Sequence, residues 1–65
     1  MKARTAESRA LLYAAIERAM AEFPDMRVGQ LIVNALPPGN NDPFYIEDAA
    51  LAARIDAMVA KAKEA

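Results

Sequence analysis

The stretch PDMRVGQLIVNALPPG, from Pro24 to Gly39, decides how this chain folds. It holds an almost continuous apolar run between two breaks that contain proline. Pro24 disfavours the helical conformation at the residue before it and cannot donate to a helical ladder, so a first helix has to end at about Phe23. Asp25 is a favourable N-cap residue, and we expect it to start a second helix running from Met26 to about Leu36.

This second helix is predicted to be the central element. Its apolar residues cover most of the circumference, so we expect the helix to be enclosed by its neighbours. They are Val28, Leu31, Ile32, Val33, Ala35 and Leu36. The polar residues Arg27, Gln30 and Asn34 recur at spacings of three and four and form one narrow stripe. Gly29 costs about 1 kcal/mol relative to alanine inside a helix, so we expect a neighbouring backbone or aromatic ring to approach closely there.

The flanking segments each have the apolar spacing of an amphipathic helix. Thr5 is a favourable N-cap for the first of them, and Asp48 is expected to cap a third helix that runs to about Lys63. The predicted core faces are Leu12, Ile16, Ala19, Met20 and Phe23 in the first helix and Leu51, Ile55, Met58, Val59 and Ala62 in the third. The sequence therefore predicts an all-α fold, a small three-helix domain formed by residues 1–65.

The connection LPPGNNDPFY, from Leu36 to Tyr45, separates the second helix from the third. Pro38 and Gly39 suit the two central positions of a type II turn, because proline presets φ and glycine accepts a positive φ. Asn40 to Pro43 are expected to continue as an irregular loop. Phe44 to Ile46 is too short for a sheet of its own, and we expect it to be extended and to lie across the helices.

The composition argues against several functional classes. The 65 residues include eight basic and nine acidic ones but no histidine and no cysteine. This removes disulfides, the usual zinc clusters and the common nucleophile–base pairs. The adjacent acids Glu47 and Asp48 are what the start of a helix favours, so we assign them no catalytic or metal-binding role. We therefore expect a protein that is not an enzyme and that uses no metal or cofactor.

The chain is expected to be cytoplasmic. No run reaches the roughly 18 apolar residues that a membrane span needs, and the first residues lack the apolar segment of a secretion signal. A core of this size rarely supplies more than about 3–5 kcal/mol, so self-association is an obvious further source of stability. Leu11, on the polar side of the first helix, and Tyr13 are the candidate self-contact residues, together with the alanine-rich face of the third helix.

The polar stripe of the second helix has two interpretations. In the structural one, Arg27 pairs with Asp25, Glu47 or Asp48, while Gln30 and Asn34 hold the loop that follows the helix. In the functional one, the stripe faces a protein partner. Phe44 and Tyr45 would then lie beside it and supply the aromatic contact area that interfaces favour.

The function predicted from these features is a non-catalytic protein-interaction module. It would act as a homodimer or on a protein partner, as a small phage or prophage regulator or inhibitor. A helix-turn-helix-like nucleic-acid binder is an alternative, but the second helix is too apolar and offers too few cations for phosphate contacts. An oligomer that binds a small anion or nucleotide through Arg27 is the other alternative.

The segments FPDMRVGQLIVNAL and DPFYIED resemble a family of small bacterial and phage-encoded proteins. Its pattern is an aromatic residue followed by Pro-Asp-x-Arg-x-Gly-Gln-Leu, then an asparagine, then Phe-Tyr-x-Glu-Asp. The resemblance covers about residues 23–51 and implies no activity. It implies that the pattern-bearing positions here are Arg27, Gly29, Gln30, Asn34, Phe44, Tyr45, Glu47 and Asp48. Members of the family are expected to differ in the PPGNN loop.

Overall fold

The computed structural model describes residues 6–39 and 46–64. These residues form three helices, α1 (Ala6–Glu22), α2 (Val28–Ala35) and α3 (Asp48–Glu64). They contain no strand, so the predicted all-α, three-helix fold is confirmed. The expected cap at Thr5, the irregular loop at residues 40–43 and the extended conformation of Phe44 and Tyr45 fall outside the described residues.

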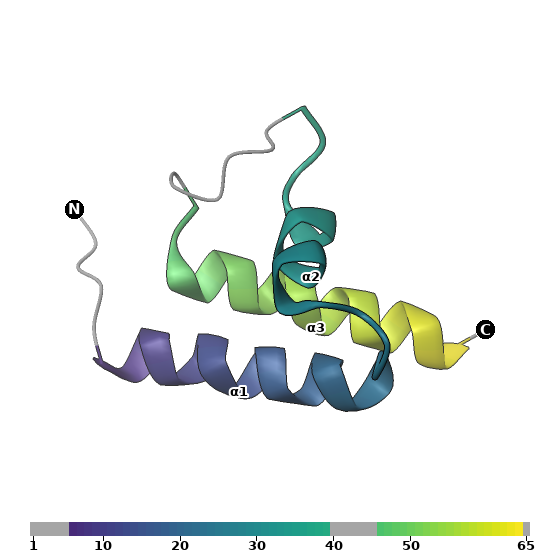
Figure 1. The fold of residues 1–65 in the computed structure, drawn as a ribbon. Coiled ribbons are helices and arrows are strands. Elements are labelled where there is room, and N and C mark those ends of the chain that lie inside the picture. The colour runs from purple at the N-terminus through teal and green to yellow at the C-terminus, as the bar shows by residue number, and fades with distance from the viewer. Residues whose placement is uncertain (1–5, 40–45, 65) are drawn as a thin grey trace.

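The two long helices α1 and α3 make the most extensive contact between elements. They run in the same direction, and the short helix α2 crosses them as the chain returns towards the start of α3 (Figure 1). The sequence predicted an enclosed α2, and this is wrong on one side of the helix. Leu31 is fully buried, whereas Val28 and Val33 are 45% and 50% exposed. The reason is that α1 and α3 pack mainly on each other, so α2 is covered from one side.

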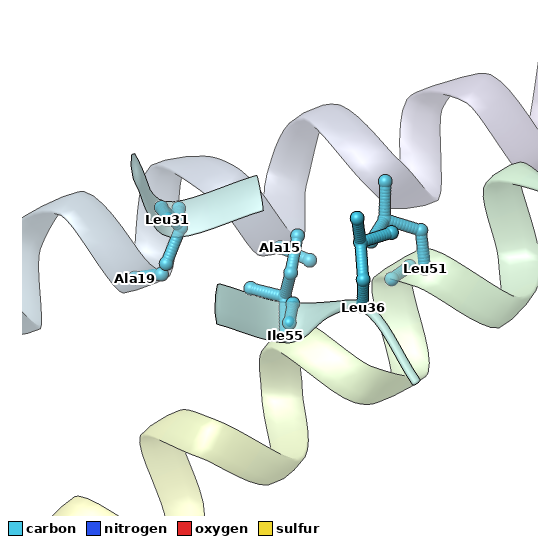
Figure 2. Packing of buried hydrophobic residues seen from close by; sticks show 8 residues of the cluster. Ala15, Ala19, Leu31, Leu36, Leu51 and Ile55 are labelled. Carbon is cyan, nitrogen blue, oxygen red and sulfur yellow. The ribbon is translucent and has the colours of Figure 1, made fainter. Parts of the chain in front are cut away.

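The core joins all three helices through both small and large side chains (Figure 2). On α1 its fully buried residues are Ala15 and Ala19, whose methyl groups let the neighbouring helices approach closely. Leu31 and Ile55 are the largest fully buried side chains, and burying each contributes about 1.5–3 kcal/mol. The core contains Ala15, Ala19, Leu31, Ala35, Leu36, Leu51, Ala52 and Ile55. Most of the other predicted core-face residues are partly buried against it.

The break between α1 and α2 is a turn rather than the predicted helix cap. The N–H of Met26 donates to the carbonyl oxygen of Phe23 at 3.0 Å, which leaves Pro24 and Asp25 at the central positions of the turn. Proline is favoured at the first of these positions. Asp25 is therefore not the N-cap of α2. The N-cap is Arg27, two residues later, which is extended and makes no capping hydrogen bond through its side chain.

The end of α2 follows the expected proline chemistry. Leu36 is extended, with φ −67° and ψ 152°, because a residue that precedes a proline avoids the helical conformation. Gly39 has φ 81°, as the second central residue of a type II turn requires.

The start of α3 differs from the prediction by one residue. The carbonyl of Glu47 accepts a hydrogen bond from the N–H of Leu51 at 2.9 Å, so Glu47 occupies the N-cap position. Asp48 is the first residue of the helix rather than its cap. Its carboxylate there still favours the positive end of the helix dipole.

Gly29 does not accommodate a neighbour, contrary to the prediction. The residue is exposed, and a Cβ atom added to it would meet nothing within 4 Å. No neighbour within the described structure uses the space that its missing side chain leaves. Glycine therefore lowers the stability of the helix without allowing a closer contact inside the molecule.

The burial of Ile55 gives a first prediction. Ile55→Val should lower the free energy of unfolding by about 0.5–1.5 kcal/mol, and Ile55→Ala by roughly 2–5 kcal/mol. The larger loss is comparable with the whole expected stability of a domain this small, so Ile55→Ala should be largely unfolded. Urea denaturation followed by circular dichroism at low protein concentration checks this, with the half-exposed Val33→Ala as a control that changes the stability of the monomer by less than about 0.5 kcal/mol. Equal effects at both positions would contradict the core described above.

The two glycines give a second prediction. Gly29→Ala should stabilise the protein by about 0.5–1 kcal/mol, because alanine is the better helix former and the space is open. Gly39→Ala should destabilise it by about 1–2 kcal/mol, because a Cβ atom is strained at positive φ. Thermal unfolding of both variants at one low protein concentration checks the opposite signs. A loss of stability in Gly29→Ala would show that the glycine has a packing role.

Candidate interaction surface

The polar stripe Arg27, Gln30 and Asn34 is exposed but does not form one site. Arg27 lies just before α2, at its N-cap. Gln30 lines an open hollow of about 340 Å³ beside residues 23–26. Asn34 lines a different hollow of about 310 Å³, between the end of α2 and α3. The three residues therefore share a helix edge while meeting different surroundings.

The structural interpretation of the stripe depends partly on residues outside 6–39 and 46–64. Arg27 shows no ion pair there with Asp25, Glu47 or Asp48. An ion pair that these residues do contain joins Arg18 of α1 to Asp56 of α3, with an N···O distance of 2.9 Å. The loop that Gln30 and Asn34 were expected to hold lies mostly outside the described residues, as do the partner-binding candidates Phe44 and Tyr45.

An arginine that the sequence reasoning missed holds the end of α2. Arg54 of α3 donates from Nε to the carbonyl oxygen of Ala35 and from Nη2 to that of Leu36, at 2.5 and 3.4 Å. The last carbonyls of a helix have no partner within the helix and carry the negative end of its dipole. The guanidinium of Arg54 gives these carbonyls hydrogen-bond donors and places a positive charge at the negative end of the dipole. It thereby fixes α2 on α3. No local pattern reveals such a contact, because the acceptors lie 18 and 19 residues earlier in the chain.

An apolar arc of α2 extends from the edge of its buried stripe to the side that faces away from the core. Val28 and Val33 are 45% and 50% exposed, Gly29 is exposed, and Ile32 is half-buried between them. At 100° per residue these positions span an arc of roughly 140° around the helix. We call Val28, Gly29, Ile32 and Val33 the α2 outer face. It lies beside the polar edge that carries Gln30 and Asn34.

The candidate self-contact residues of α1 are both exposed. Leu11 is 57% and Tyr13 62% exposed. Two positions along a helix differ by roughly 200°, so these side chains leave opposite flanks of α1. A single flat contact with a partner therefore cannot use both of them. Of the apolar surfaces described here, the α2 outer face is the one that brings several residues together.

The hollow beside Asn34 combines an apolar floor with a basic rim. We call it the α2–α3 hollow. Its apolar lining comes from Ala35, Ala53, Ala57 and Met58, and its polar lining from Asn34, Arg54 and Lys61. Ala53 and Ala57 lie one turn apart on α3, and their methyl groups are too small to fill the space beside the end of α2. The hollow thus exists because the side chains of Ala53 and Ala57 are small.

The described residues offer little else on which chemistry could be built. None of their acidic side chains gather in a group of three or more that could hold a metal ion. No buried side-chain nitrogen or oxygen atom among them lacks a hydrogen-bond partner. None of the described helices is long and apolar enough to cross a membrane. The surface features of α2 and α3 are therefore the ones from which a function has to be argued.

The two interhelical arginines give a third prediction. Arg54→Met keeps the apolar stem and removes the guanidinium, and should lower the free energy of unfolding by about 1–2 kcal/mol because two helix carbonyls lose a charged donor. Arg18→Met removes an ion pair whose side chains are 55% and 46% exposed, and should cost no more than about 1 kcal/mol. Parallel denaturation of the two variants checks the order, and a smaller loss for Arg54→Met would contradict it.

Comparison of the chain with protein-family models, with curated proteins and with solved structures finds no match. The resemblance to small bacterial and phage proteins therefore stays a prediction from the sequence. No activity, ligand or partner is transferred to this chain from a relative. Three features bear on function: the α2 outer face, the α2–α3 hollow and the composition of the chain.

Proposed function

We propose that this chain is a non-catalytic protein-interaction module that associates with a second copy through the α2 outer face. The observation that carries the proposal is the half-exposure of Val28 and Val33 on a helix that is fully buried at Leu31. Apolar area removed from water contributes roughly 25 cal/mol per Å². A partner that covers this face would therefore stabilise the complex through the same effect that forms the core.

The length of α2 supports this role. The helix has eight residues, and isolated helices shorter than about 12–15 residues are marginal in water. Its valines are β-branched and add little helix propensity of their own. Packing from one side and the contact of Arg54 with its last carbonyls hold it in place. Contact from a second side would add to the stability of the element that is least stable alone.

Gly29 supports a second copy as the partner. Its missing side chain serves no contact within the described residues, since a Cβ atom there would meet nothing within 4 Å. In the middle of the α2 outer face, the same absence would let a second helix approach closely. A two-fold axis near Gly29 would place each α2 against its own equivalent, and two-fold symmetry is the commonest in homodimers.

The composition of α2 favours this proposal over the alternatives. A recognition helix needs polar side chains for base edges and cations for phosphates. The α2 outer face offers valines instead, and Arg27 is the basic residue that adjoins it. The sequence lacks histidine and cysteine, which supply the commonest nucleophile–base pairs of enzymes. A small module that acts through contacts alone fits a regulator or inhibitor.

Self-association and its surface give a fourth prediction. The wild-type chain should dimerise at high micromolar concentration, and Val33→Lys should be monomeric with an unchanged melting temperature at low concentration, because it places a charge in the apolar contact. Leu11→Lys is the matched control: it makes the same change at a similarly exposed site on α1 and should leave the dimer intact. Sedimentation equilibrium or light scattering measures the mass. A wild-type monomer at all concentrations refutes the proposal, and dissociation by Leu11→Lys alone would move the interface to α1.

A further inference from the structure

The α2–α3 hollow is large enough to receive side chains of another molecule. Its volume of about 310 Å³ lies at the lower limit of the roughly 300–1,000 Å³ typical of ligand sites. The floor consists of alanine methyl groups and Met58. Methionine adapts its shape to the group that it contacts. The hollow therefore suits one or two apolar side chains rather than a whole cofactor.

The rim of the hollow is positively charged. Arg54 and Lys61 contribute one charge each, and none of the described residues that line the hollow is acidic. The carboxyl ends of α2 and α3 each carry a partial charge of roughly −0.5, which offsets about one of these two charges. A local excess of positive charge remains, although the chain as a whole has a net charge of −1.

The rim also has hydrogen-bond donors to spare. Arg54 uses Nε and Nη2 on the carbonyl groups of α2, and a guanidinium carries five N–H groups in all. The Lys61 ammonium and the Asn34 amide are exposed donors on the same rim. A carboxylate is the acceptor that matches donors of this kind, because its two oxygens can accept from more than one of them.

We propose that the α2–α3 hollow binds an acidic segment of a partner protein. A carboxylate of the segment lies between Arg54 and Lys61, and an adjacent apolar side chain lies on the floor formed by Ala53, Ala57 and Met58. This proposal rests on the function proposed above, since it names the chemistry of a partner for an interaction module. It uses a different surface, so the α2 outer face and the hollow can be occupied together.

The floor distinguishes this partner from a nucleic acid. Phosphates would meet the two cations of the rim but gain nothing from a floor of methyl groups. Nucleic-acid sites also need several cations along a track, and the hollow has two. A glutamate or aspartate next to a leucine or similar residue would contact both the basic rim and the apolar floor. The observations therefore favour a protein segment that is both acidic and apolar.

The test is a titration of the isotope-labelled, full-length chain followed by nuclear magnetic resonance. The probe is the capped peptide Glu-Leu-Leu-Glu, with Gln-Leu-Leu-Gln and Lys-Leu-Leu-Lys as matched peptides and a random duplex DNA as a fourth probe. The acidic peptide should shift the side-chain signals of Asn34 and Arg54 and the amide signals of Ala53 and Ala57. The neutral and basic peptides should cause markedly smaller shifts. No shift from the acidic peptide, equal shifts from the three peptides, or shifts at these residues from DNA alone overturns the proposal.

Two charge reversals locate the site. Lys61 and Lys63 both lie in the last turn of α3, so Lys61→Glu and Lys63→Glu change the net charge and the helix dipole equally. Lys61 lines the hollow and Lys63 does not. Lys61→Glu should weaken binding of the acidic peptide about fivefold or more, as expected for an exposed charge contact of about 1 kcal/mol. Lys63→Glu should weaken it less than twofold. Equal losses would reveal a general charge effect and overturn the site.

The same titration on Val33→Lys separates this inference from the proposed self-association. Binding of the acidic peptide to that variant with unchanged affinity supports the hollow as a site in its own right, whatever the oligomeric state of the wild type. Loss of binding in Val33→Lys places the peptide on the α2 outer face and overturns the inference. A dimer that binds no acidic peptide leaves the proposed function standing and refutes the hollow alone.

Discussion

The packing of α1 on α3 through small side chains is the constraint on which the other features depend. Ala15 and Ala19 are fully buried, and the two helices run in the same direction (Figure 1). The chain therefore has to travel back along the pair before α3 can begin. With eight residues at a rise of about 1.5 Å each, α2 spans roughly 12 Å, about half the length of either long helix. The position of α2 on one side of the pair, and its open outer face, follow from this return path.

Much of this architecture could be predicted from local patterns. Proline marked the end of α1 and the end of α2, the apolar spacing marked the buried sides of α1 and α3, and Gly39 marked a turn that needs a positive φ. The errors arose where the outcome depends on other elements. Whether Val33 is enclosed depends on how α1 and α3 pack, and Asp25 became a turn residue because Pro24 suits the position before it. Spacing within a helix reports a preference for burial and does not identify what covers the helix.

The candidate surfaces were partly predictable for the same reason. The exposure of Leu11, Gln30 and Asn34 follows from the periodicity of their helices, and the structure agrees. Arg54 could not be identified in this way, because the carbonyl groups that it contacts come from a helix far from it in the sequence. The hollow could not be predicted from the sequence either, since it exists only where two alanines of α3 meet the end of α2. Sequence periodicity thus predicted which residues are exposed but not which of them lie together.

The position of Arg54 couples the carboxyl end of α2 to the α2–α3 hollow. Its guanidinium contacts the last carbonyls of the helix and also forms part of the rim of the hollow. An anion drawn to the free side of this group would compete for, or reinforce, its hold on the helix. By linkage, any such effect is reciprocal: if the anion changes how firmly Arg54 holds the end of α2, a change in that hold alters the affinity for the anion by the same factor. Arg54 therefore links the position of the end of α2 to the occupancy of the hollow.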